Sequence, residues 1–226
     1  MIKTVRSMDN TTLKYLKAVY SDKHQEATYP YPYGGYDELL EEMYYRAGQP
    51  DGSKRVLDLN LGSGNLASYF YVGGCESWGA VYGEDSVEQV RDRLPDLSVI
   101  RCVGAVACDV VHMSMEDIKP LLQHIGERAR EGFDVVVLSY DLRGMRAEIF
   151  VALMEGIFEE LARTRKSLVL VGCVSFKTEE DRRQYEGEEK GALVFEEVKG
   201  ALIKKKLRVQ YTQLFPCGGL YKIKKK

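Results

Sequence analysis

Residues 54–66, K-R-V-L-D-L-N-L-G-S-G-N-L, contain the pattern that decides the fold. Residues 55–59 form a short apolar run, long enough for a buried strand and too short for a helix. A glycine turn follows at once, and residues 65–71 can form a helix. A strand, a glycine turn and a helix in this order make the first unit of a doubly wound α/β fold.

The turn itself consists of Gly62, Ser63 and Gly64. Because glycine has no Cβ, the main chain can bend sharply here and can come close to a ligand. Asp58, at the end of the expected strand, can fix the turn or accept a hydrogen bond from an amino group of the ligand. The dinucleotide-binding fingerprint G-x-G-x-x-G is not matched, since Ala67 stands where its third glycine would fall.

Length and composition indicate one globular domain. The chain has 226 residues, of which 45% are hydrophobic and 29% are charged, and this suffices for a substantial core. The net charge of −2 provides no overall field for nucleic acid or anionic membrane. Basic residues gather near the C-terminal end. The simpler interpretation is that they belong to a solvated helix end and an exposed edge strand, and the alternative is a polyanion-binding patch. They are Lys204, Lys205, Lys206, Arg208, Lys222, Lys224, Lys225 and Lys226.

The cysteines indicate neither a disulfide framework nor a metal site. There are five of them, an odd number, and no C-x-x-C pair occurs. Most lie in apolar runs, where cysteine is a small buried hydrophobe. The sequence opens with no signal-peptide pattern, and no apolar run reaches membrane-spanning length. We therefore expect an intracellular protein of the cytoplasm or nucleus, without a metal and without a membrane contact.

The first 35 residues are expected to form a separate N-terminal region. Residues 11–20 have the spacing of a short amphipathic helix, and a Tyr/Pro-rich arm follows. Tyr31 and Tyr33 in this arm are candidates for substrate contact, if the arm covers the site as a lid or wall. The alternative is that the arm simply packs onto the domain. The domain proper is expected to begin with a helix over residues 36–47 and to extend over 36–226.

Acidic residues follow two further expected strands. Glu84 and Asp85 come after the strand expected at residues 78–83, where one carboxylate can accept hydrogen bonds from both hydroxyls of a ribose. Glu84 is the better candidate and Asp85 the alternative, because either can instead cap the helix expected at residues 87–94. Asp109 follows a third strand, expected at residues 97–103.

This order of features resembles the class I S-adenosylmethionine methyltransferases. The segment V-L-D-L-N-L-G-S-G-N resembles their first motif, and V-A-C-D-V-V-H-M-S-M-E-D at residues 106–117 resembles the motif whose aspartate contacts the adenine amino group. The resemblance implies S-adenosylmethionine as the cofactor. It also implies cofactor contacts from Asp58, Asn60, Gly62, Ser63, Gly64, Glu84 or Asp85, Asp109, Val110 and Met113.

A fourth strand, expected over residues 133–139, ends where catalytic groups of this fold lie. Ser139, Tyr140 and Asp141 are therefore the catalytic candidates. Methyltransferases that act on exocyclic amino groups of bases carry [DNS]-P-P-[YFW] here, whereas this chain reads S-Y-D-L, which argues against amino-base methylation. Tyr140 can wall the acceptor pocket and Asp141 can bind a cationic acceptor, or either can cap the next helix.

The rest of the chain completes the pattern. Helices are expected over residues 118–131, 146–162 and 195–205, and a buried strand over 167–174, with an exposed charged segment at 177–190. The ending R-V-Q-Y-T-Q-L-F, P-C-G-G, L-Y-K-I-K predicts an antiparallel hairpin. The expected fold is a doubly wound α/β domain whose seven-stranded, mostly parallel sheet ends in this hairpin, as in class I methyltransferases.

Within that superfamily the sequence resembles the histone lysine methyltransferases that lack a SET domain. The shared features are Tyr33-Gly34 ahead of the first domain helix, D-L-N-L-G-S-G-N at the turn and the ending G-G-L-Y-K-I. Gly35 replaces an acid of that family, and S-Y-D replaces its asparagine pair. This resemblance implies a macromolecular acceptor, with protein lysine ahead of RNA or DNA. The sequence leaves open whether an activating partner subunit is required. The alternative from another class is a catalytically inactive binding subunit. A small-molecule methyltransferase is a third alternative, disfavoured only by the lack of a large lid insertion.

Overall fold

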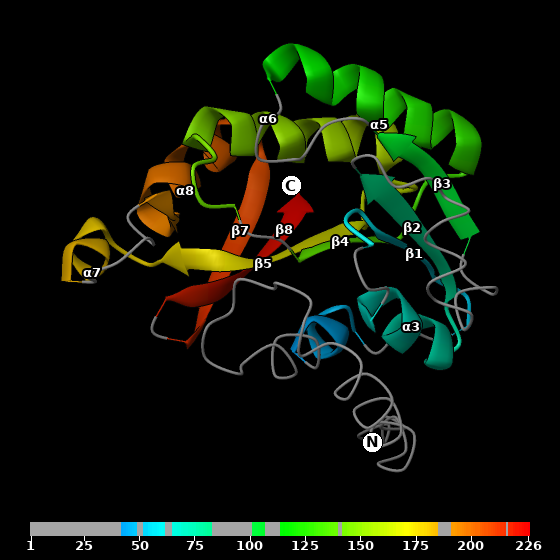
Figure 1. Ribbon diagram of the computed structural model, residues 1–226, viewed down its shortest axis with the longest axis horizontal. Helices are drawn as coiled ribbons and strands as arrows, with labels where there is room; N and C mark the ends of the chain where they lie inside the picture. Colours follow the sequence, from blue (N-terminus) through cyan, green and yellow to red (C-terminus); the bar gives the residue numbers. More distant parts are fainter. Residues whose placement is uncertain are drawn as a thin grey trace.

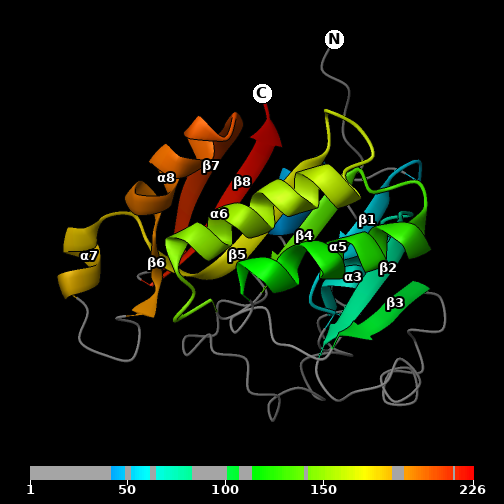
Figure 2. The same ribbon diagram turned by 90° about the horizontal axis from the view of Figure 1, so that it is seen from above.

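The computed structural model describes residues 42–48, 52–61, 65–82, 101–106, 114–139, 142–184, 191–215 and 217–226. A central sheet separates two layers of helices (Figures 1 and 2). Seven strands lie in the order β3-β2-β1-β4-β5-β8-β7, and the short strand β6 pairs with β5. The strands are β1 Arg55–Asp58, β2 Glu76–Tyr82, β3 Arg101–Val106, β4 Val135–Ser139, β5 Leu168–Phe176, β6 Leu193–Val194, β7 Leu207–Phe215 and β8 Gly218–Lys225.

The sheet is parallel from β3 to β5, and β8 runs antiparallel to both β5 and β7. This arrangement confirms the predicted fold class, including the C-terminal hairpin. Strands β1, β4 and β5 are buried along their whole length, because helices cover both faces of the sheet. Burial on both faces explains why these strands read as unbroken apolar runs in the sequence.

Helices α5, α6 and α8 cover one face of the sheet, and α3 together with the helical residues 42–46 covers the other (Figure 1). The helices are α3 Asn65–Val72, α5 Met115–Ala129, α6 Ala147–Gly156, α7 Glu179–Gln184 and α8 Phe195–Lys204. A π-helical turn, η3, continues α6 over Ile157–Leu161. Helix α7 has no buried residue, as expected for the charged segment around it.

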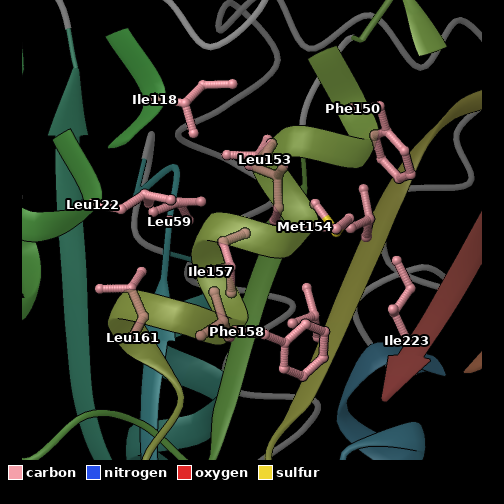
Figure 3. Packing of buried hydrophobic residues seen from close by; sticks show 14 of the residues in the cluster. Leu59, Ile118, Leu122, Phe150, Leu153, Met154, Ile157, Phe158, Leu161 and Ile223 are labelled. Atoms are coloured by element: carbon pink, nitrogen blue, oxygen red, sulfur yellow. The ribbon is translucent and has the colours of Figure 1, made fainter. Parts of the chain in front are cut away.

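The largest hydrophobic cluster among the described residues lies under α5, α6 and α8. Figure 3 shows how α6 and η3 supply Leu153, Met154, Ile157 and Phe158 to it. A β-carbon on Gly156 would lie 2.7 Å from Leu122 Cδ1 of α5, so the absence of a side chain allows these two helices to approach closely. A second cluster joins Met43 and Phe70 to the opposite face of the sheet.

Several details differ from the sequence-based expectation. Helix α5 begins at Met115 rather than at residue 118, with Pro120 inside it. The helix expected over residues 146–162 begins at Ala147 and changes to π geometry after Gly156. Strand β3 ends at Val106 rather than Val103. Gly218 and Gly219, expected in the hairpin turn, belong to β8 instead. A β-carbon on Gly219 would lie 2.4 Å from the Tyr211 ring, so the glycine allows close packing rather than a bend. Among the described helices, none has the length and apolar character that a membrane span requires.

Candidate functional site

The candidate site lies at the carboxyl ends of β1 and β4, which are neighbours in the middle of the sheet. From β1 the chain builds outward to β2 and β3 on one side, and from β4 to β5 on the other. The order of strands therefore reverses between β1 and β4. In open α/β sheets, ligands bind in the crevice outside the carboxyl ends of the strands at such a switch point.

Asp58 is the last residue of β1, and its side chain is buried at this edge, with only 2% of the residue exposed. It lies opposite Gly79 of β2 and Val137 of β4. The backbone N–H of Asn60 donates a hydrogen bond to Asp58 Oδ1 over 3.2 Å. This hydrogen bond fixes the Asp58 carboxyl against the backbone of the segment that follows β1.

Burial raises the pKa of the Asp58 carboxyl to about 8, although hydrogen bonds from the backbone N–H groups of Asn60 and Ala67 act in the opposite direction. A carboxyl group in such an environment is costly to ionise, because charge is poorly solvated there. A cation that binds next to it would favour the ionised form. Asp58 thus has the properties of a receptor for a positively charged group.

Asn60 connects the turn after β1 to the end of β4. Its Nδ2 donates a hydrogen bond to the carbonyl oxygen of Ser139 over 3.3 Å. Two backbone hydrogen bonds hold the same segment, from Leu59 N–H to the Val137 carbonyl at 2.8 Å and from Leu61 N–H to the Ala80 carbonyl at 2.9 Å. The chain leaving β1 is therefore anchored to both neighbouring strands.

Ser139, the last residue of β4, is 2% exposed, and its Oγ has no hydrogen-bond partner among the described atoms. Side chains alternate along a strand, so Ser139 points to the same face as Val137, which belongs to the cluster on the α3 side. Asp58 points to that face too, because Val56 belongs to the same cluster. A buried carboxyl and a buried hydroxyl thus lie on one face of the switch point.

Gly79 is a positioning residue that the sequence analysis did not identify. It lies directly opposite Asp58 on β2, and a β-carbon there would come within 2.5 Å of Leu61 Cδ1. Glycine at this position lets Leu61 pack against β2 just before the glycine turn. An isolated glycine inside the run W-G-A-V-Y was the available signal, because such a glycine often marks a close approach of another chain segment.

A capping box fixes the start of α5 immediately after the segment predicted to contact adenine. The backbone N–H and Oγ of Ser114 both donate to Asp117 Oδ2, over 3.0 and 2.6 Å. These hydrogen bonds lower the pKa of the Asp117 carboxyl. The helix therefore begins at a fixed position, directly after Ser114.

Of the predicted site residues, the structure brings Asp58, Asn60 and Ser139 together at one edge of the sheet. The others lie outside the described residues, and their roles stay predictions. These are Tyr31, Tyr33, Gly62, Ser63, Gly64, Glu84, Asp85, Asp109, Val110, Met113, Tyr140 and Asp141. Within the described ranges, no group of three or more His, Cys, Asp or Glu side chains could hold a metal ion.

No protein-family model matches the sequence, and no curated protein matches it significantly. Solved structures do match the fold. Human N-acetylserotonin methyltransferase in complex with S-adenosylmethionine aligns over 83% of this chain and 54% of its own, with a TM-score of 0.55 and 16% identity. The mitomycin 7-O-methyltransferase MmcR aligns over 84% of this chain and 55% of its own, with a TM-score of 0.54 and 16% identity.

A TehB-like S-adenosylmethionine-dependent methyltransferase from Corynebacterium glutamicum aligns over nearly the whole of both chains. It covers 96% of this chain and 99% of its own, with a TM-score of 0.52 and 14% identity. By contrast, the chain spans about half the length of MmcR and of the human enzyme. The acceptors named for further structures of this fold vary, and include ribosomal protein L11 and a glycopeptide. The chain therefore has the class I methyltransferase fold.

Proposed function

We propose that this protein is an S-adenosylmethionine-dependent methyltransferase whose acceptor is a macromolecule, with protein lysine as the favoured acceptor. The observation that carries the proposal is the buried Asp58 carboxyl at the switch point of a class I methyltransferase sheet. The methionine part of S-adenosylmethionine has an ammonium group. Such a group would relieve the cost of ionising Asp58 by pairing with it.

The remaining cofactor contacts follow from the sequence motifs. Gly62, Ser63 and Gly64 would bring the backbone close to the ligand, and Asn60 would keep that turn attached to β4 through Ser139. Glu84, or alternatively Asp85, would accept hydrogen bonds from the ribose hydroxyls. Asp109, Val110 and Met113 would bind and flank the adenine.

The chemistry requires few side chains. S-adenosylmethionine, when bound, supplies a methyl group that is activated by its bond to a sulfonium sulfur. The leaving group is a neutral thioether once a nucleophile has taken the methyl. The protein has to hold the two reactants in line, and positioning of this kind can supply much of the rate enhancement. It must also accept an amine in its neutral form. Ser139, Tyr140 and Asp141 are the candidates for orienting that amine, because Ser139 ends the strand next to Asp58 and the other two follow it in the sequence.

Protein lysine is favoured because the glycine turn and the closing strand resemble the histone lysine methyltransferases without a SET domain. Tyr31 and Tyr33 would then line the path of the acceptor. RNA and DNA are the alternative acceptors. The sequence S-Y-D-L after β4 lacks the Pro-Pro of enzymes that methylate base amino groups, and this makes a base the less favoured acceptor.

Two measurements test the proposal. Isothermal titration with S-adenosylmethionine should detect binding to the unaltered protein, strong loss of binding in Gly62→Val, and weakened binding in Asp58→Asn. Glu127→Gln is the matched control, because this carboxyl is exposed near the C-terminal end of α5, away from the predicted cofactor contacts. If the unaltered protein failed to bind, or bound equally well after Gly62→Val, the cofactor assignment would be wrong.

Transfer of labelled methyl groups to separated nucleosome, RNA and DNA fractions then identifies the acceptor. Label on a protein lysine supports the favoured acceptor, and label on RNA or DNA supports the alternative. Binding of S-adenosylmethionine without transfer to any fraction would favour the inactive binding subunit.

A further inference from the structure

The net charge of −2 conceals a strong separation of charge along the chain. Two segments, residues 162–168 and 203–226, contain eleven of the 32 basic residues and no acidic residue. The rest of the chain holds the other 21 basic residues against all 34 acidic ones. The eleven are Arg163, Arg165, Lys166, Lys204, Lys205, Lys206, Arg208, Lys222, Lys224, Lys225 and Lys226.

The fold brings these two segments together at the amino end of β5. Leu168, the first residue of β5, pairs with Lys224 of β8, and Lys224 in turn lies directly opposite Arg208 of β7. The backbone N–H of Lys226 donates to the Lys206 carbonyl over 2.9 Å, which places the end of α8 beside the end of β8. We call the surface formed by the eleven residues the basic edge.

Structural roles explain only part of the basic edge. Lys204 is in the last turn of α8, and Lys205 and Lys206 follow it, where positive charge stabilises the helix dipole. Lysines on an edge strand hinder aggregation through that edge. Lys222, Lys224 and Lys225, however, lie on β8, which pairs with β5 on one side and β7 on the other. Protection of a sheet edge therefore does not account for Lys222, Lys224 and Lys225.

The arrangement also carries an electrostatic cost. Arg208 and Lys224 are like charges directly opposite each other on neighbouring strands, a pairing that destabilises a sheet. Lys222 lies two residues from Lys224, on the same face of β8, and donates to the Arg46 carbonyl over 3.1 Å. Burial, and then the charges of Lys224 and Arg46, lower the pKa of Lys222. Glu42, which pairs with Arg46, acts in the opposite direction but does not outweigh these effects.

Few acids neutralise these residues. Within the described part of the chain, Lys205 pairs with Glu155 at 2.9 Å and Arg163 pairs with Asp134 at 3.4 Å, and the other nine form no ion pair. Ten of the eleven are exposed, and Lys222 is half-buried. A surface with this charge and exposure is complementary to a polyanion.

We propose that the basic edge binds the phosphate backbone of double-stranded DNA. DNA presents about one negative charge per 1.7 Å of helix axis, which a dense row of Lys and Arg side chains can neutralise. A single strand is a poorer fit, because proteins bind single strands by stacking bases on aromatic side chains, and no exposed aromatic residue lies in the two segments as far as the structure describes them. A lipid surface is also a poorer fit, because among the described side chains of the two segments Ile203 is the one large apolar side chain that is exposed.

The basic edge and the candidate site lie at opposite ends of the parallel strands. The basic edge lies at the amino end of β5, whereas Asp58 and Ser139 lie at the carboxyl ends of β1 and β4. Ser139 pairs with Gly172 of β5, so about four residues, or roughly 13 Å at about 3.3 Å per residue, separate it from Leu168 along the strand direction. DNA held there would anchor the protein rather than enter the site, so the inference does not rest on the proposed methyl transfer.

Fluorescence anisotropy with a labelled 20-base-pair DNA duplex, measured between 50 and 200 mM KCl, tests the proposal. Arg208→Gln combined with Lys224→Gln should weaken binding on the order of tenfold per lost phosphate contact at 100 mM salt, and should make the salt slope less negative by about 2. The charge-preserving pair Arg208→Lys and Lys224→Arg should retain binding. The matched control, Lys119→Gln with Arg128→Gln, removes the same charge from exposed positions on α5 and should leave binding unchanged.

Competition with unlabelled ligands separates the other occupants. Single-stranded DNA of the same length, duplex RNA and vesicles with anionic lipid should compete less well than duplex DNA. The proposal is overturned if any of these competes better, if no duplex binding is seen at 50 mM salt, or if the α5 control weakens binding as much as the substitutions on β7 and β8. Urea unfolding of each variant verifies that it is folded.

Discussion

Asn60 and Ser139 are 79 positions apart in the chain, yet the Asn60 side-chain amide donates a hydrogen bond to the Ser139 carbonyl over 3.3 Å. This contact joins the segment that leads into the glycine turn to the end of the strand that carries the catalytic candidates. Whatever binds at the turn is thereby coupled to the position of Ser139. The relationship gives Asn60 a role as a positioning residue within the proposed site.

Asn60→Ala should therefore weaken S-adenosylmethionine binding. The loss of one partly buried hydrogen bond should cost about 1 kcal/mol, or roughly fivefold in affinity. Titration calorimetry measures this effect, and urea unfolding shows how much of it reflects stability. Gln123→Ala is a suitable control, because Gln123 donates a comparable side-chain hydrogen bond to Glu160 on the exposed surface, and its loss should not change affinity.

Asp58 should make the stability of the ligand-free protein depend on pH. In the unfolded chain this carboxyl titrates near 3.8, whereas burial raises its pKa to about 8 in the folded protein. Between these values the unfolded state binds fewer protons, so raising the pH favours unfolding. The contribution of the neutral Asp58 carboxyl to the free energy of unfolding is fully present below about pH 4 and is lost as the pH rises toward 8.

Urea unfolding of the unaltered protein and of Asp58→Asn between pH 4 and 8.5 measures that contribution. Asparagine has nearly the same shape but cannot ionise. The free energy of unfolding of the unaltered protein, taken relative to Asp58→Asn, should fall as the pH rises. Parallel pH profiles for the two proteins would contradict the raised pKa.

Arg55 should contribute strongly to stability because it is buried and caps a helix. Its side chain is 7% exposed and donates to the carbonyls of Ala129 at 3.1 Å and Gly132 at 2.7 Å, at the C-terminal end of α5. It also lies over the Trp78 and Phe133 rings, at 5.2 and 5.4 Å from their centroids. Arg55→Met would leave these carbonyls unsatisfied, and we expect a loss of about 3 kcal/mol in urea unfolding.

Arg101 provides the matched comparison for Arg55. Like Arg55, it lies over the Trp78 ring, at 5.4 Å, and pairs with Glu76; the Arg101 pair is 2.6 Å long and the Arg55 pair 3.4 Å, but the Arg101 side chain is 62% exposed. Exposed pairs contribute little, so Arg101→Met should cost less than about 1 kcal/mol. Equal losses for the two variants would show that burial does not decide the contribution of Arg55.

Two glycine substitutions should have opposite effects. A β-carbon on Gly219 would lie 2.4 Å from the ring of Tyr211, which is stacked on Phe195 and donates to the Ser175 carbonyl at 3.1 Å. Because that ring is held in place, Gly219→Ala should lower the free energy of unfolding by about 2 kcal/mol. Gly200→Ala in α8 meets no atom within 4 Å and should raise it by about 0.5–1 kcal/mol. Thermal and urea unfolding of the two variants compare these effects directly.

Much of the fold could be predicted because its signals are local. The apolar runs at β1, β4 and β5 have the length of strands and are uninterrupted because both faces are covered. The hairpin was predicted from two strand patterns around a turn. The position of its turn could not be predicted. Gly219 is required for packing against Tyr211 rather than for a bend, and a sequence does not distinguish a glycine needed for close packing from one needed for a turn.

The sequence by itself determined the order of strands and helices, the glycine turn after β1 and the position of Asp58 at the end of that strand, since these depend on side-chain periodicity and backbone sterics over a few residues. Tertiary structure alone decided the raised pKa of Asp58, the link from Asn60 to Ser139 and the meeting of two basic segments at the amino end of β5. The physical reason is that desolvation and charge density depend on which distant segments pack together, and that is set by strand pairing across the whole sheet.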